Sequence, residues 1–226
     1  MASDVEIVVA VDAEAAARDV AERLVEAARA GGNIVITGGG SAGRAYELAA
    51  GLETDWSAVE LWWSDERCVP PADENSNYGM AKTTLLDRVS VGAAHRMRGE
   101  LGREHGAEEY ERELGTVEAF DFMLLGLGPD GHVASLFPEQ PTLDEAERRV
   151  IGSEAKLEPY VDRITLTLPV LRSARELVFL VTGENKADAA KRAFAGEPSK
   201  ATPGSLVRAA GGRTTAVLDV AAAARL

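Results

Sequence analysis

The chain of 226 residues contains a single cysteine, Cys68, and only three histidines. One cysteine excludes an internal disulfide and a zinc site built from several cysteines. A lone cysteine is usually a small buried hydrophobe, and no histidine lies near this one in sequence, so we assign the thiol no role. His95, His105 and His132 lack the close spacing of metal ligands, and we therefore expect no metal site.

Long hydrophobic runs are also absent. No apolar segment approaches the roughly 18 residues that are needed to cross a bilayer. The amino-terminal segment, MASDVEIVVAVDAE, carries acidic Asp4 and Glu6 and no basic stretch before its short apolar run, so it does not resemble a secretory signal. We expect no membrane contact and a cytoplasmic location.

Basic residues are outnumbered: 24 lysines and arginines face 37 aspartates and glutamates, which gives a net charge of −13. Proteins bind polyphosphate backbones through lysines and arginines that displace counterions, so we expect no nucleic acid partner. A single phosphate group remains compatible with this charge, because charges beyond a Debye length of about 8 Å are largely screened. The few basic residues beside glycine-rich loops therefore matter more than the total.

The composition, 46% hydrophobic and 27% charged, is that of a packed globular protein. Strand-like segments alternate with helical ones without any break in composition, which predicts a mostly parallel sheet covered by helices on both faces. We thus expect one α/β domain of Rossmann-like type over residues 1–226. The expected strands are 5–11, 34–37, 59–64, 120–127, 149–153, 163–168, 177–182 and 214–218; the expected helices are 13–30 (capped by Asp12), 44–52, 80–89, 104–117 and 184–194.

A glycine loop, TGGGS over residues 37–41, lies between an expected strand and an expected helix. Successive glycines let backbone amides face a ligand, and a helix terminus favours an anion, so the loop has the form of a phosphate cradle. It lacks the lysine of the nucleotide-binding P-loop and is not GxGxxG, so a nucleotide cofactor is not indicated. The alternative is a plain tight turn in which Ser41 caps the helix, and the residues alone leave both open.

A histidine loop, GPDGHVASLFP over residues 128–138, follows the most apolar segment of the chain. A strand that leads into such a loop places the imidazole of His132 at the carboxyl edge of the sheet, where open α/β folds bind ligands. We interpret His132 as a general base and Asp130 as the group that orients it. Alternatively, Asp130 and Gly131 form an ordinary turn and the histidine only hydrogen-bonds the loop. His95 and His105 are expected in polar, exposed surroundings.

Two basic residues lie in similar positions. Arg67, in SDERCV over 64–69, can offer a planar fork to a phosphate, although an arginine between acids is more often an exposed ion pair. Lys186, in VTGENK over 181–186, lies near the first turn of an expected helix, where negative charge is favoured. A bound phosphate would resolve that conflict; the alternative is a solvated lysine. The polar loop 65–79 is long enough that we expect it to be functional or disordered.

Six segments together resemble the 6-phosphogluconolactonase family. They occur in the family's order and spacing and span nearly the whole chain: TGGGS, SDERCVPPADENSNYGM, FDFMLLGLGPDGHVASLFP, DRITLTLPVL, VFLVTGENKADAA and PGSLVR. The resemblance implies the Rossmann-like α/β fold that this family shares with glucosamine-6-phosphate deaminases, a deaminase/isomerase-like fold. One departure is visible, because many members continue the glycine loop as serine, threonine, proline and a basic residue, whereas this chain has SAGR over 41–44.

The resemblance implies a carboxylic ester hydrolase of carbohydrate metabolism. Its substrate would be the sugar phosphate 6-phospho-D-glucono-1,5-lactone and its product 6-phospho-D-gluconate, in the oxidative pentose phosphate pathway, without metal or organic cofactor. In such proteins the histidine corresponding to His132 is the base that activates water. The residues that the resemblance associates with the substrate phosphate are Arg67, Lys186, Gly39, Gly40 and Ser41. Direct attack by water is favoured over a serine acyl-enzyme because it is the simpler mechanism.

Two rival functions are weighed against this one. Deaminases of this fold usually continue the histidine motif with phenylalanine, asparagine and glutamate, whereas this chain continues SLFP over 135–138 and then Glu139, which favours the lactonase. A non-catalytic sugar-phosphate sensor attached to a DNA-binding module should show a basic segment at one terminus, and neither end has one. We expect a monomer.

Overall fold

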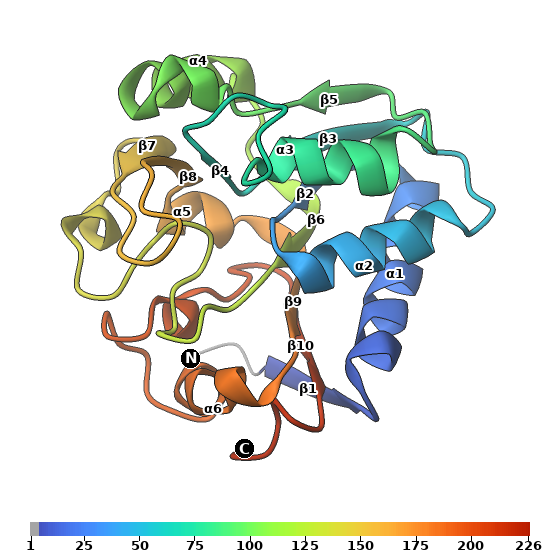
Figure 1. The fold of residues 1–226 in the computed structure, drawn as a ribbon, viewed down its shortest axis with the longest axis vertical. Coiled ribbons are helices and arrows are strands. Elements are labelled where there is room, and N and C mark those ends of the chain that lie inside the picture. Colours follow the sequence, from blue (N-terminus) through green and yellow to red (C-terminus); the bar gives the residue numbers. More distant parts are fainter. Residues whose placement is uncertain (1–4) are drawn as a thin grey trace.

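The structure, a computed structural model, describes residues 5–226, so that Asp4 lies outside the described residues. Its centre is a seven-stranded sheet in the order β1-β10-β9-β6-β2-β3-β5, in which every neighbouring pair is parallel (Figure 1). The predicted mostly parallel sheet is therefore confirmed. Its strands are β1 (Val5–Ala10), β2 (Gly32–Ile36), β3 (Val59–Trp63), β5 (Ala93–His95), β6 (Phe120–Leu125), β9 (Ala174–Val181) and β10 (Arg213–Asp219).

Helices cover both faces of this sheet, as predicted. Figure 1 shows α1 and α2 on one side, and α5, α6 and a smaller sheet on the other. No helix in the described part of the chain is both long enough and apolar enough to cross a membrane. The helices are α1 (Ala13–Ala30), α2 (Gly40–Ala50), α3 (Asn77–Ala81), α4 (Arg103–Leu114), α5 (Leu168–Leu171) and α6 (Ala187–Phe194).

Helix α1 forms where its sequence predicts it. The Asp12 side chain caps its start by accepting a hydrogen bond from the backbone N–H of Ala15 at 2.7 Å. The helix ends at Gly31, whose φ of 72° is one that glycine adopts without steric cost. Its buried face is mostly alanine, so the helix axis can lie close to the sheet.

A second, three-stranded antiparallel sheet in the order β4-β8-β7 departs from the prediction. The expected strands 149–153 and 163–168 belong to this sheet, as β7 (Val150–Ser153) and β8 (Arg163–Leu166), and not to the parallel one. The connection over 154–162 is too short for the crossover that parallel neighbours require. The third strand, β4 (Asp65–Arg67), arises inside the polar loop, where no strand was expected.

His95 also differs from its expected exposed setting. It ends the edge strand β5, its side chain is only 21% exposed, and its ring stacks on Trp62 at a centroid distance of 3.8 Å. Its two ring nitrogens contact carboxylate oxygens of Glu60 at 2.6 Å and Glu113 at 2.8 Å. His95 thus joins β5 to β3 and α4. His105 is exposed on α4, as expected.

The topology gathers the candidate loops at one edge of the large sheet. The glycine loop follows β2, the histidine loop follows β6, the loop with Lys186 follows β9, and β4 with Arg67 follows β3. These four strands are neighbours in the order β9-β6-β2-β3 and all run in the same direction. Their carboxyl ends therefore meet at the position where open α/β sheets bind ligands.

Candidate active site

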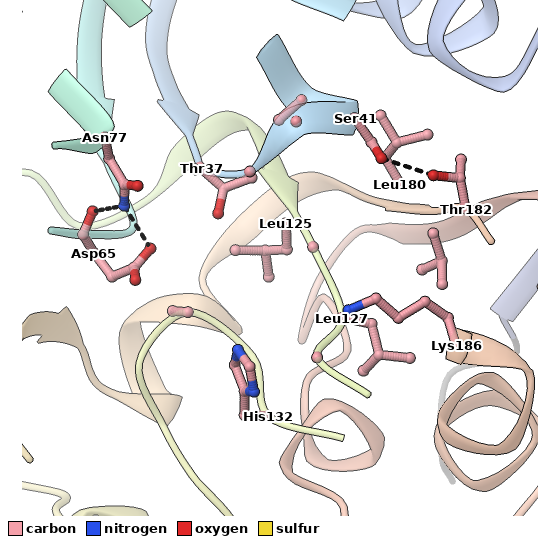
Figure 2. Close-up of a pocket in the computed structure, with 18 of the residues that line it drawn as sticks. Thr37, Ser41, Asp65, Asn77, Leu125, Leu127, His132, Leu180, Thr182 and Lys186 are labelled. Carbon is pink, nitrogen blue, oxygen red and sulfur yellow. Dashed lines mark hydrogen bonds between the residues drawn. The ribbon is translucent and has the colours of Figure 1, made fainter. Parts of the chain in front are cut away.

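A pocket of about 300 Å³ opens at this edge of the sheet (Figure 2). Residues from all four loops line it, together with the ends of the strands that precede them. Every candidate residue predicted from the sequence lines this pocket except Asp130. Asp130 lies outside the lining and contacts Nδ1 of the His132 ring. The titratable or polar lining side chains are Thr37, Ser41, Asp65, Arg67, Asn77, His132, Thr182 and Lys186.

The histidine loop is a compact turn that fixes His132. The backbone N–H of Gly128 donates to the carbonyl oxygen of His132 at 2.9 Å, and Gly131 adopts a φ of +97°. A Cβ atom on Gly128 would collide with the imidazole, so only glycine leaves room for the ring at that position. The ring packs against Phe137 at a centroid distance of 4.9 Å. Backbone turns and packing together therefore set the ring position.

Asp130 is hydrogen-bonded to this imidazole. Its Oδ1 lies 2.6 Å from Nδ1 of His132 and also accepts the backbone N–H of His132 at 3.1 Å. Burial acts to raise the pKa of the Asp130 carboxyl. The hydrogen bonds from His132 and the charge of His132 outweigh this effect and hold the pKa below its usual range. A carboxylate at Nδ1 requires the proton on that nitrogen, which leaves Nε2 as the ring's acceptor. The pair has the form of the His–Asp part of a catalytic triad.

The glycine loop presents backbone to the pocket. Gly39 has a φ of +102° and is the N-cap of α2, and a Cβ atom placed on Gly39 or Gly40 would meet nothing within 4 Å. The alternative in which Ser41 caps the helix is wrong, because the N-cap is Gly39 and no side chain caps the helix. Its hydroxyl is hydrogen-bonded to that of Thr182 at 2.7 Å, which ties the glycine loop to the end of β9 (Figure 2). The loop therefore offers open amides beside a second loop.

Lys186 ends the short 3₁₀ helix Glu184–Lys186, and its side chain extends into the pocket (Figure 2). The alternative of a solvated surface lysine is therefore wrong. Burial lowers the pKa of its ammonium group, and the nearby charge of Asp130 offsets this only in part. No carboxylate among residues 5–226 forms an ion pair with this ammonium, so its positive charge is available to a ligand.

Arg67 enters the pocket from β4. Its Nη1 donates to the carbonyl oxygen of Asn75 at 2.6 Å, and its Nε is buried without a hydrogen-bond partner in the described part of the chain. The alternative, in which Arg67 forms an exposed ion pair, is therefore wrong. Arg67 is the register partner of Arg163 across β4 and β8, and burial and the charge of Arg67 both act to lower the pKa of Arg163. Arg67 lines the pocket, and its charge favours an anionic ligand.

Sequence reasoning missed the residues that shape the pocket around Arg67. Glu66, which is 2% exposed, accepts the backbone N–H groups of Arg67, Asn77 and Tyr78, each at 2.7 Å. It thereby folds the polar loop so that the Asn77 side chain faces the pocket. Burial raises the pKa of Glu66, although these hydrogen bonds act against the rise. The adjacent acids Asp65 and Glu66 at the end of a strand could have indicated a functional position, whereas no local sequence pattern indicates Asn77.

Cys68 lies just outside this site. Its thiol is half-buried, and burial raises its pKa to about 12, so the thiolate that a nucleophile needs does not form near neutral pH. Over residues 5–226, no cluster of three or more histidine, cysteine, aspartate or glutamate side chains is arranged to hold a metal ion.

Comparisons with known proteins identify the family and the fold. Residues 10–216 match the family model described as glucosamine-6-phosphate isomerases/6-phosphogluconolactonase. A 6-phosphogluconolactonase of Streptomyces coelicolor is 39% identical, over 95% of this chain and 90% of that protein. A solved structure of 6-phosphogluconolactonase from Trypanosoma brucei, 25% identical, superposes with a TM-score of 0.86 over 99% of both chains. A monomeric glucosamine-6-phosphate deaminase, 16% identical, has a TM-score of 0.85 over 98% of this chain and all of that one, which concerns the fold alone. The predicted deaminase/isomerase-like fold is confirmed.

Proposed function

Because the chain belongs to the glucosamine-6-phosphate isomerase/6-phosphogluconolactonase family, we propose that it hydrolyses 6-phospho-D-glucono-1,5-lactone to 6-phospho-D-gluconate. The observation that carries this proposal is one pocket in which an oriented imidazole, a free lysine and an open glycine loop come together. The product belongs to the oxidative pentose phosphate pathway. We further propose that residues 1–226 act as a single sugar-phosphate-binding hydrolase domain, monomeric and cytoplasmic.

The substrate phosphate binds between the glycine loop and Lys186 in this proposal. Gly39 and Gly40 expose backbone beside the amino terminus of α2, where the helix field favours an anion. Ser41 adds a hydroxyl, and Lys186 adds a positive charge that forms no ion pair with a carboxylate of residues 5–226. Arg67 is the second cation that lines the pocket, and it adds to the attraction for the dianionic substrate.

His132 then acts as the general base. A water molecule attacks C1 of the lactone, and Nε2 of His132 takes its proton as the new C–O bond forms. The Asp130 carboxylate stabilises the imidazolium that results. The tetrahedral intermediate collapses as the bond from C1 to the ring oxygen breaks, and His132 returns the proton to that oxygen. The negative charge on the C1 oxygen needs donors, for which the loop amides are candidates.

The deaminase alternative is not favoured by this site. Deaminases usually carry a glutamate shortly after the histidine motif, and the acid nearest in sequence, Glu139, is exposed and outside the pocket lining. Its backbone N–H donates to the carbonyl of Lys200, which directs this segment to the surface. If the purified protein released ammonia from glucosamine 6-phosphate faster than it opened the lactone, the proposed activity would be wrong.

The test of the proposed function is the opening of freshly made 6-phosphogluconolactone with and without the protein, since this lactone also hydrolyses unaided. We expect turnover well above the spontaneous rate, in proportion to protein concentration and unaffected by a chelator. Turnover of this kind would also discard the sensor alternative. A rate equal to that of the blank would refute the proposal.

Loss of a pocket cation should weaken substrate binding more than it slows the chemical step. We expect Lys186→Ala and Arg67→Ala to raise KM roughly 10- to 100-fold with a smaller change in kcat, because a charged contact made equally in ground and transition states acts on KM. Lys191→Ala, which removes an exposed lysine of α6, is the matched control and should leave KM unchanged. Equal losses on a lactone that lacks the phosphate would contradict the assignment.

Binding of the product should weaken in alkali earlier than for an ordinary lysine site. Burial lowers the pKa of Lys186, so its ammonium loses the proton at a lower pH than a solvated lysine does, while the phosphate stays dianionic. The affinity for 6-phosphogluconate, measured by calorimetry from pH 7 to pH 10, should therefore fall as pH rises. Lys186→Arg keeps its charge over this range and should flatten the profile. A wild-type affinity that does not change with pH would contradict this prediction.

A further inference from the structure

One charged side chain that lines the pocket has no part in the mechanism above. This side chain is that of Asp65, the first residue of β4, which is 6% exposed. No lysine, arginine or histidine between residues 5 and 226 lies within ion-pair distance of its carboxylate. A buried carboxylate without a cation is unfavourable unless hydrogen bonds compensate it.

The protein satisfies this carboxylate only in part. Oδ2 accepts the hydroxyl of Ser135 at 2.7 Å, and Oδ1 accepts that of Ser64 at 3.0 Å. The amide nitrogen of Asn77 lies at 3.5 Å from Oδ1, at the limit of a hydrogen bond (Figure 2). An ionised carboxylate has about four acceptor positions, so acceptor capacity remains for a ligand in the pocket.

The charges of Asp65 and Lys186 indicate which part of the substrate lies next to the Asp65 carboxylate. Figure 2 shows Asp65 and Lys186 on opposite sides of the pocket, with His132 on a third side. The phosphate is repelled by the Asp65 carboxylate and attracted by the Lys186 ammonium. In the six-membered lactone ring, C2 lies opposite C5, which bears the phosphate arm, and C2 is also bonded to the reacting carbon C1. The ring atom directed toward Asp65 is therefore C2, and its hydroxyl is the donor that a carboxylate accepts.

We propose that Asp65 is a specificity-determining residue that accepts a hydrogen bond from the C2 hydroxyl of the lactone. This inference rests on the proposed function and adds to it the ring hydroxyl that the site recognises. Ser135 and Ser64 hold the carboxylate in place, so the substrate meets an acceptor that is already oriented. A site built around a hydroxyl discriminates against an analogue that lacks it, because the buried acceptor is then left unpaired.

The experiment compares 6-phosphogluconolactone with its 2-deoxy analogue in the wild type and in Asp65→Asn. We expect the wild type to prefer the natural lactone by roughly 10- to 100-fold in kcat/KM, because the bond is charge-assisted. The asparagine variant keeps the shape and loses the charge, so this preference should shrink several-fold. The ratio within each protein matters, since it cancels general loss of activity. Asp144→Asn, an exposed aspartate outside the pocket, is the matched control and should keep the wild-type ratio.

A second variant separates recognition from support of the histidine loop. Ser135→Ala removes one of the two hydroxyls that orient the Asp65 carboxylate but keeps the carboxylate charge and the bond from Ser64, so it should lower activity on both lactones and leave a larger preference between them than Asp65→Asn does. The inference is overturned if Asp65→Asn lowers both activities by one factor, or if Ser135→Ala reduces the preference as much as Asp65→Asn does. Calorimetric binding of 6-phosphogluconate and its 2-deoxy form to the wild type gives the same ratio without turnover. A wild type that opens no lactone but prefers the natural acid would refute the proposed function and leave this inference standing, whereas equal affinities would refute the inference.

Discussion

Replacing His132 by alanine is expected to lower kcat by roughly 10²- to 10⁴-fold, the range that a positioned general base contributes. The residue lines the pocket, its Nδ1 is held by Asp130 at 2.6 Å, and Nε2 is left as the acceptor for the proton of the attacking water. KM should change little, because the phosphate contacts remain. The measurement is the initial rate of lactone opening, corrected for spontaneous hydrolysis.

Two controls accompany this variant. The midpoint of thermal unfolding should be close to that of the wild type, since the His132 side chain is 24% exposed and its ring packs against Phe137. His105→Ala removes a histidine that is exposed on α4 and should retain full activity. If His132→Ala turned over the lactone at the wild-type kcat, the assignment of His132 as the base would have to be abandoned.

Asp130→Asn is expected to have the second largest effect, a loss of roughly 10²-fold or more in kcat, by analogy with the aspartate of a catalytic triad. An asparagine amide can turn its NH₂ group toward Nδ1 of His132, which then becomes the acceptor. The proton moves to Nε2, the nitrogen that must accept the proton of water. The geometry of the loop is kept, but the imidazole is in the wrong tautomer.

The tautomer itself supplies a measurement that a purely structural role would not affect. Nitrogen NMR of the His132 ring should report a protonated Nδ1 in the wild type and a protonated Nε2 in Asp130→Asn. Asp188→Asn, an exposed aspartate of α6, is the matched control and should leave both kcat and the tautomer unchanged. A variant at Asp130 with wild-type kcat would show that this carboxylate does not orient the base.

Much of the fold could be predicted because the signals are local. The apolar run of β6 and the Asp12 cap of α1 are written in consecutive residues, and both elements form where they were expected. The order of such segments determines the parallel sheet, which in turn brings the glycine and histidine loops to one edge. The grouping of His132 with the two basic residues thus followed from the loops' positions at strand ends.

The parts that were missed depend on distant partners. Strand β4 is made of polar residues, Asp65–Arg67, and exists only because it pairs with β8, far along the chain. Glu66 orders the loop by accepting N–H groups that no sequence pattern identifies. His95 is covered by Trp62, its direct partner in the register of β3 and β5. In each case tertiary contacts override local preference.

The most direct test of the account is a crystal structure of the His132→Ala variant with bound 6-phosphogluconate. The account predicts the phosphate against the amides of Gly39 and Gly40 with Lys186 in hydrogen-bond contact, and the C1 carboxylate beside the space vacated at position 132. A product bound in the reverse direction, with its phosphate next to position 132 and its carboxylate at Lys186, would contradict it.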